Sequence, residues 1–388
     1  MKKDILNKYW LTIEPYVYIG LTNTNVLLYN TLDGETIRSE NINIIKLLQE
    51  ILKEDNGGIV LLSHEELNND NVKYFIEQLR EKFMGDIIPV SLSKNKPVQI
   101  YPLFNSSNII VRQNIYKKQN FTSEKSSLNY LTEIYLVVDS TTDINHLIPL
   151  LDSFPRKLII HIIGNPINVN DYNKLLEYLQ FNPFAMNIIH CQGGDIIKAL
   201  NFDNTCFKYK IEVRFPINEC VRRLFSSLGS AAYEFLFFIT SEQEYQESLE
   251  IINTYDIDNY NISPVYTGKN LDFFEKNVFL DEEDILSNKI TIKDIFTRQI
   301  LNINDFGKLT IFPNGDVYAN PINPRIGNIY SQEIKELIDK ELESGASWLR
   351  IRNSPPCCNC VYQWLCPSPS NYELEIGRAN LCNLCKNK

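Results

Sequence analysis

From residue 130 to residue 300 the chain alternates short apolar runs with longer stretches in which apolar and polar residues mix. Six runs are rich in β-branched and aromatic residues, and helical patterns lie between most of them. Such alternation predicts a parallel sheet with helices outside it. The sequence therefore predicts an α/β body of six strand–helix units, for which a flavodoxin-like open sheet is the alternative to a barrel. The six runs are 131–138, 157–163, 186–191, 210–215, 233–239 and 261–266.

The N-terminal residues begin with strands. Two β-rich runs flank the turn-prone Thr22-Asn23-Thr24-Asn25, which is a hairpin signal, and a third run follows Asp33-Gly34. Two stretches with apolar residues at helical spacing come next. We expect a small winged-helix-like module over residues 1–88, then a proline-containing, polar linker over 89–128. The strands are expected at 16–20, 25–30, 36–38 and 59–62, and the helices at 42–52 and 72–83.

Composition narrows the class of protein. The 388 residues include 44% hydrophobic residues, enough for a sizeable core. Acidic residues outnumber basic ones, 48 against 38, and no dense Lys/Arg block occurs, which argues against nucleic acid as the main partner. No run of 18 apolar residues is present, so we expect no membrane partner. Without a signal peptide pattern, the expected location is the cytoplasm.

The cysteines crowd into the tail. Six of the nine fall in the last 32 residues, with Cys-x2-Cys spacing at 357/360 and again at 382/385. A reducing cytoplasm disfavours disulfides. A Cys-x2-Cys turn places two sulfurs close together, and two later cysteines can complete a four-thiolate site. Such a site suits tetrahedral zinc or an iron–sulfur cluster. Spacing alone does not separate zinc from iron.

Residues upstream of these cysteines resemble the SPASM domain of radical S-adenosylmethionine peptide maturases. The resemblance lies in residues 307–318 (GKLTIFPNGDVY), 327–330 (GNIY) and the following Cys-x2-Cys-x5-Cys. It implies a SPASM-like Cys-rich domain over 301–388 that holds one 4Fe–4S cluster. The ligands that it implies are Cys357, Cys360, Cys366 and Cys382, with zinc as the alternative metal. Cys385 is the alternative fourth ligand, and Cys358 is expected to point away.

A full SPASM pattern carries a second set of thiolates, which this chain lacks. Asn320 stands where Gly-x4-Cys requires a cysteine, and Ser370 stands where the final x3-Cys requires one. No cysteine lies 10–16 residues before Gly315. The resemblance therefore implies one cluster instead of two, with a mainly structural role.

The central body, residues 129–300, is similar to the partial (β/α)6 TIM-like barrel of the same enzymes. Those enzymes need Cys-x3-Cys-x2-Cys after the first strand to bind and cleave S-adenosylmethionine, but the loop 139–149 contains no cysteine. The three corresponding places hold Thr142, His146 and Pro149. After the second strand, Gly164-Asn165-Pro166 replaces part of the usual Gly-Gly-Glu-Pro. No cleavage of S-adenosylmethionine is expected.

Together these features resemble pseudo-radical-SAM proteins of Bacteroidetes peptide-modification systems. The resemblance implies a non-catalytic accessory protein that binds a ribosomal precursor peptide, a radical SAM maturase, or both. The N-terminal module is similar in architecture to PqqD-like elements, which take a leader peptide as an added strand. The expected groove lies between Thr36 and Ile37 of the third strand and Tyr74 and Gln78 of the last helix. A structural cap on the barrel is the other use of this module.

Two other functions remain open. One is a peptide-modifying enzyme with a non-standard site at the barrel mouth, and the other is a zinc-stabilised peptide-binding module. His161 and His190 fall in predicted strands, where packing is favoured over catalysis. Asp139 ends a strand and has no identified partner for a role as general base.

Overall fold

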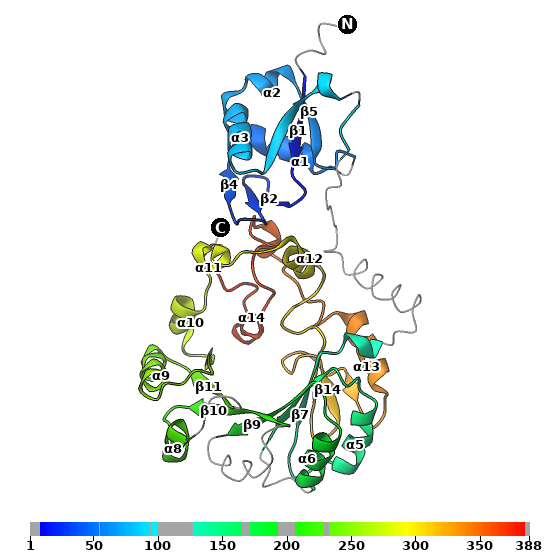
Figure 1. Cartoon of the computed structure of the whole chain (residues 1–388), viewed down its shortest axis with the longest axis vertical. Helices are drawn as coiled ribbons and strands as arrows, with labels where there is room; N and C mark the ends of the chain where they lie inside the picture. The colour runs from blue at the N-terminus through cyan, green and yellow to red at the C-terminus, as the bar shows by residue number, and fades with distance from the viewer. Residues whose placement is uncertain are drawn as a thin grey trace.

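The computed structural model describes residues 8–53, 55–93, 95–98, 127–164, 171–192, 206–227 and 233–384 (Figure 1). Most of the predicted linker, together with Asn165, Pro166 and Cys385, lies outside these residues. Within the described part, no helix is both long and apolar enough to cross a bilayer.

A nine-stranded sheet forms the body, in the order β12-β11-β10-β9-β8-β7-β13-β14-β15. The predicted α/β class is therefore confirmed, since β7 to β12 are parallel and occupy the six predicted runs. Their order follows the chain, whereas a flavodoxin-like sheet exchanges its first two strands. The strands are β7 (Glu133–Val137), β8 (Ile159–Ile163), β9 (Met186–Gln192), β10 (Lys208–Arg214), β11 (Tyr233–Ile239) and β12 (Tyr260–Pro264).

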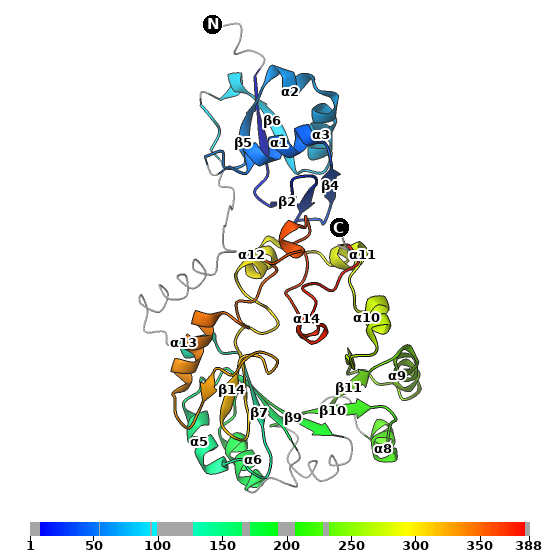
Figure 2. The same ribbon diagram turned by 180° about the vertical axis from the view of Figure 1, so that it is seen from behind.

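Helices cover one face of this sheet, as Figures 1 and 2 show. Alternate strand residues such as Ile134, Leu136, Ile160 and Ile162 are buried there, because successive side chains of a strand point to opposite faces. We call the opposite face the inner face. Its residues are mostly only partly buried and many are polar. The covering helices are α5 (Ile144–Asp152), α6 (Tyr172–Phe181), α8 (Glu219–Ser227) and α9 (Glu242–Thr254).

The tail shares the main sheet. Strand β13 (Lys308–Ile311) pairs parallel with β7, and β14 (Asp316–Tyr318) and β15 (Gly327–Asn328) follow as antiparallel neighbours. The sheet thus crosses the expected boundary between residues 300 and 301. The other elements of the C-terminal half are α10 (Leu271–Asn277), α11 (Glu282–Leu286), α12 (Ile292–Ile300), α13 (Ile334–Ser344), the 3-10 turn η4 (Cys357–Asn359) and α14 (Asn371–Ile376).

The N-terminal module contains the three predicted hairpin strands in the order β2-β3-β4. A second sheet, in the order β5-β1-β6, was only partly expected, because β1 and β6 were not recognised in the sequence. Strand β6 carries glycine and proline at its ends, which suggested a linker. The elements are β1 (Tyr9–Ile13), β2 (Val17–Leu21), β3 (Val26–Asn30), β4 (Thr36–Ser39), α1 (Ile42–Ile51), β5 (Ile59–Leu62), α2 (His64–Asn68), α3 (Asp70–Glu81), β6 (Gly85–Pro89), and the 3-10 turns η1 (Val90–Leu92) and η2 (Ser127–Tyr130).

The hairpin sheet β2-β3-β4 packs on both of its faces. Leu28 and Ile37 point into the core of the N-terminal module. Leu27 and Tyr29 point the other way, into an apolar cluster with residues of the tail and of the segment before it. The hydroxyl of Tyr29 accepts a buried hydrogen bond of 2.8 Å from the backbone N–H of Ile290. Figure 1 shows this sheet lying against the tail.

A substitution at Gly20 on β2 tests the contact between the hairpin sheet and the tail. A Cβ atom there would stand 2.0 Å from the carbonyl oxygen of Val361, a backbone atom of the tail. We expect Gly20→Ala to cost about 1–3 kcal/mol, as overpacking does, and to lower the thermal midpoint by several degrees. Leu32→Ala, an exposed change in the neighbouring hairpin turn, is the matched control. Equal midpoints for the two variants would contradict the close approach.

Candidate functional site

The four predicted metal ligands line one cavity. Cys357, Cys360, Cys366 and Cys382 surround it, so residues separated by up to 25 positions in the sequence meet there. Cys358 is exposed and does not line the cavity. Cys385, the alternative fourth ligand, lies outside the described residues. The other lining residues are Leu280, Arg352, Gln363, Asn380, Leu381 and Leu384.

Local backbone turns position the first three cysteines. The 3-10 turn η4 places Cys360 beside Cys357, with its N–H 3.1 Å from the Cys357 carbonyl oxygen. A second turn directs Cys366, whose N–H donates to the Tyr362 carbonyl at 2.9 Å. Such turns follow directly from the short Cys-x2-Cys-x5-Cys spacing.

A distant segment positions the fourth cysteine. Leu280, just before α11, forms a parallel bridge with Cys382. Its N–H donates to the Leu381 carbonyl, and its own carbonyl accepts from the Asn383 N–H, both at 3.0 Å. Residues 280 and 382 are about a hundred positions apart in the sequence, so the position of Cys382 depends on a segment outside the tail.

Two arginines flank the cavity. Arg352 is nearly buried, forms an ion pair of 2.9 Å with the buried Glu373, and places Nη1 3.8 Å from the Cys357 sulfur. Arg298 of α12 donates to the Leu365 carbonyl at 2.6 Å. Burial lowers the pKa of Arg298, while Asp294 and, to a smaller extent, Cys366 raise it. Arg298 is partly buried and Arg352 is already paired with Glu373, so these guanidinium groups would balance only part of the negative charge of a thiolate-bound metal group.

Burial also governs the protonation of Cys366. Burial is the largest cause that raises the pKa of this thiol to about 12; Arg352 opposes the rise, and the neighbouring Cys360, Cys382 and Cys357 contribute to it. Without metal, Cys366 is therefore a neutral thiol at pH 7. Thiolates are the metal-binding form, so a metal would have to displace this proton.

Four cysteines around one cavity are a donor set that suits a thiolate-bound metal group, either tetrahedral zinc or an iron–sulfur cluster. In the part of the chain that the structure describes, no three His, Cys, Asp or Glu side chains converge closely enough to hold a single ion. Asn380 donates to the Cys382 sulfur at 3.2 Å, and hydrogen bonds of this kind tune bound clusters.

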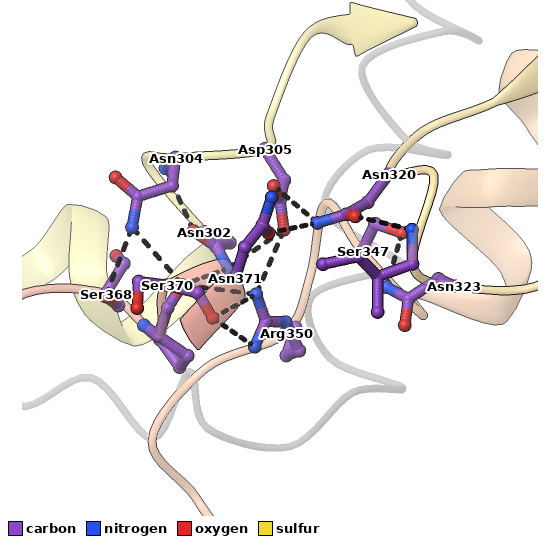
Figure 3. A network of polar contacts seen from close by, with 12 residues as sticks. Asn302, Asn304, Asp305, Asn320, Asn323, Ser347, Arg350, Ser368, Ser370 and Asn371 are labelled. Carbon is purple, nitrogen blue, oxygen red and sulfur yellow. Dashed lines mark hydrogen bonds and ion pairs between the residues drawn. The ribbon is translucent and has the colours of Figure 1, made fainter. Parts of the chain in front are cut away.

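A second buried polar centre lies beside the first, and Figure 3 shows it. We call it the amide network. Asn320 donates to a carboxylate oxygen of Asp305 at 3.0 Å and to the side chain of Asn371 at 2.6 Å. Arg350 pairs with Asp305 at 3.3 Å and donates to the Ser370 carbonyl at 3.2 Å. Further members are Asn302, Asn304, Asn323, Ser347 and Ser368.

The amide network occupies the positions where cysteines are absent. It contains Asn320 itself, the backbone of Ser370, and Asp305, which precedes Gly315 by ten residues. Asn320 and Asp305 are only 2% and 6% exposed, so their hydrogen bonds replace those that water would otherwise make. Burial raises the pKa of Asp305, while Arg350 and Asn320 lower it. Amide, carboxylate and guanidinium groups thus occupy the part of the tail where a full SPASM pattern would place cysteines.

The loop after β7 forms ordinary helix-start structure. Thr142 accepts a hydrogen bond of 2.9 Å from the Asp139 N–H, and Asp143 caps α5. His146 and Pro149 lie within α5, where the His146 ring packs against Tyr330 at 4.7 Å. The hydroxyl and N–H of Thr141 hydrogen-bond to Asp139 and lower its pKa. Among the described residues, the hydrogen bonds that Asp139 makes are with Thr141 and Thr142, which belong to the turn itself.

The predicted peptide groove is only partly assembled. The backbone of Thr36 faces away from β3, because the preceding Glu35 carbonyl accepts from Asn30 on β3 while the Thr36 carbonyl accepts from Lys82 at 2.9 Å. Ile37 is buried in the module core. Tyr74 is 62% exposed on α3, with Gln78 3.5 Å away. Among the described residues no hydrogen bond joins Tyr74 or Gln78 to β4.

One constellation escaped the sequence analysis. Glu133, His161 and His190 lie on three neighbouring strands and form a continuous polar chain on the inner face. The sequence feature that could have identified it is the alternation of side chains along each strand. His161 and His190 alternate with buried apolar residues and therefore point away from the helices.

Comparisons with known proteins return two crystal structures of SuiB from Streptococcus suis. One is bound to its precursor peptide SuiA, and the other is bound to S-adenosylmethionine. Each has 11% sequence identity and a TM-score of 0.45, and they cover 97% and 96% of this chain and 100% and 99% of their own. No protein-family model and no curated protein matches the chain. The precursor peptide and S-adenosylmethionine are bound by SuiB in those structures.

The amide network makes a stability prediction. Asp305→Asn removes the negative charge that pairs with Arg350, and the NH2 of the new amide would face groups that are themselves donors. We therefore expect the free energy of unfolding to fall by about 3 kcal/mol. Thermal unfolding followed by circular dichroism measures it. Asp339→Asn on α13, for which the structure shows no ion pair, is the matched control. A loss no larger than that of the control would mean that the network contributes little.

Proposed function

We infer that this protein is a non-catalytic accessory protein in the maturation of a ribosomally synthesised peptide. It binds the leader of the precursor, a partner radical SAM maturase, or both, and one 4Fe–4S cluster fixes its tail. The observation that carries this proposal is the cavity lined by Cys357, Cys360, Cys366 and Cys382. The SPASM-like motif upstream and the sequential order of the six parallel strands support the same function.

The cluster would have a structural role. Bound to the four thiolates, it would rigidly link η4, the turn that contains Cys366, and the segment around Cys382 that pairs with Leu280. Arg352 and Arg298 would balance part of its charge, and Asn380 would hydrogen-bond to one sulfur ligand. The loop after β7 holds Thr142, His146 and Pro149 in place of thiolates, which supports the absence of radical chemistry in the barrel.

The free edge of β4 is the proposed site for the leader. Strand order β2-β3-β4 leaves β4 at the edge of its sheet. The Thr36 N–H and C=O point outward, so an added strand could pair with them after displacing Lys82. Exposed Tyr74 on α3 supplies apolar surface in the same module.

Metal content tests the cluster. We expect about four irons per chain after anaerobic purification, and loss of most of that iron in Cys366→Ala. Cys358→Ala is the matched control, because Cys358 is exposed and does not line the cavity. Metal analysis and the charge-transfer absorption of the cluster measure both variants. Retention of iron by Cys366→Ala would contradict the ligand set.

The same preparation separates the two other functions. Zinc in place of iron would identify a zinc-stabilised binding module. Cleavage of S-adenosylmethionine on reduction, or modification of a peptide, would identify an enzyme with a barrel-mouth site. Iron without cleavage supports the accessory role.

Leader binding has a test at a single backbone group. Proline at position 36 removes an N–H that faces outward and leaves the bonds to β3 in place, as edge strands permit. We expect Thr36→Pro to weaken binding of the precursor about tenfold or more, because the strand loses a hydrogen bond and meets the proline ring. Fluorescence anisotropy with short peptides encoded beside the gene measures it. Thr36→Ala, which keeps the N–H, should bind normally.

A further inference from the structure

The inner face of the main sheet carries a row of polar side chains. Glu133 comes from β7, His161 from β8 and His190 from β9, and Lys210 lies beside His190 on β10. Lys210 in turn pairs with Glu234 of β11 at 3.1 Å. His161 is 4% exposed, whereas its neighbours in the row are partly exposed. His190 lies two residues before the end of β9, near the carboxyl edge where sites form in parallel sheets.

Three of these residues form a continuous chain. His161 Nδ1 lies 3.0 Å from His190 Nε2, and His161 Nε2 lies 3.5 Å from a carboxylate oxygen of Glu133. Tyr135 donates its hydroxyl to the same oxygen at 2.6 Å and stacks on the His161 ring, with 4.2 Å between centroids. Lys308 lies 3.5 Å from the other oxygen. The carboxylate is therefore held on three sides.

The charge of Glu133 fixes the tautomers along the chain. Its hydrogen bond with His161 is the largest cause that lowers the Glu133 pKa to about 2, so this group only accepts at neutral pH. With a single ring proton, His161 carries it on Nε2 and accepts at Nδ1, which is the tautomer we assign. His190 must donate through Nε2, which leaves the lone pair on its Nδ1. Among the described residues, no hydrogen bond uses that nitrogen.

His190 is also kept neutral. Burial, together with the neighbouring His161 and Lys210, lowers its pKa to about 4. A neutral imidazole whose far nitrogen is fixed by a histidine–carboxylate pair is the arrangement that holds a proton acceptor in position.

We propose that Glu133, His161 and His190 form a proton relay on the inner face, in which His190 Nδ1 accepts a hydrogen bond from a bound polypeptide. Glu133 and His161 are positioning residues. Lys210 stands beside His190 and can meet a carbonyl oxygen, so the pair matches a hydroxyl or amide N–H adjacent to a peptide carbonyl. This assignment rests on the proposed function, because it takes the precursor peptide as the ligand.

The charges on this face favour a polypeptide over an anion. Three cations on this face have acidic partners: Lys308 with Glu133, Lys210 with Glu234, and Arg214 with Glu212 at 3.3 Å. No surplus positive charge remains among these pairs to attract a phosphate. A neutral chain with regularly spaced donors and carbonyls fits such a surface.

Imidazole nitrogen NMR of the full-length protein tests the relay. The chain has four histidines, so His→Gln variants assign every ring. We expect His190 with a proton on Nε2, a bare Nδ1, and a neutral ring down to about pH 5. Glu133→Gln should move the signals of both His161 and His190, whereas Glu177→Gln on α6 should move neither.

Tyr135→Phe is a second variant in case Glu133→Gln does not fold, and it should shift His161 while keeping the ring stack. A proton on Nδ1 of His190, or an ordinary pKa near 6.5 for that ring, would overturn the relay. The spectrum of the unmodified protein decides this without any variant.

The ligand is tested with N-acetylserine methylamide, which carries a hydroxyl and two amides. We expect saturable shifts of the His190 signals, absent in His190→Gln and at least threefold weaker in affinity in Lys210→Met. Shifts elsewhere, or none, would overturn the polypeptide assignment. Leader binding at β4 is measured separately, so loss of the precursor interaction with an intact His190 response would reject the proposed function and leave the relay standing.

Discussion

The contact between the hairpin sheet and the cysteine-lined tail is the constraint on which the other parts depend. Tyr29 and Leu27 of β3 share one apolar cluster with Tyr362, Leu365 and Cys366. The thiol of Cys366 therefore lies directly behind the surface on which the N-terminal module rests. Arg298 approaches the same place from α12 and binds the Leu365 carbonyl. The charge balance in the cavity and the packing of the N-terminal module against the tail therefore depend on the same group of residues.

The tail also joins the main sheet by contacts that involve no cysteine. Strand β13 pairs with β7, and the buried Trp348 donates its ring N–H to the Lys308 carbonyl of β13 at 3.0 Å. The amide network then fastens residues 368–371 to the loops around β13 and β14. These contacts fix the geometry between the main sheet and the tail.

Local sequence patterns account for much of the fold but not for the assembled sites. Alternating apolar runs located all six parallel strands, because a buried strand needs a continuous apolar sequence. Strands β1 and β6 were missed, since each pairs only with residues far along the chain. Close spacing identified Cys357, Cys360 and Cys366, whereas the place of Cys382 depends on Leu280. The relay of Glu133, His161 and His190 required strand register, which no local pattern encodes.

Two arginines connect the tail's two polar centres. Arg350 binds the carbonyls of Pro369 and Ser370 in the amide network. Arg352, two residues later, binds the Pro367 carbonyl at 2.6 Å and faces Cys357. The segment 367–370 is therefore held from both centres. The Arg350 side is closed by hydrogen bonds and an ion pair among protein groups, whereas the Arg352 side borders the cysteine-lined cavity. The attachment of the tail to the main sheet therefore uses no cysteine, while the N-terminal module packs against residues next to the cavity, including Cys366.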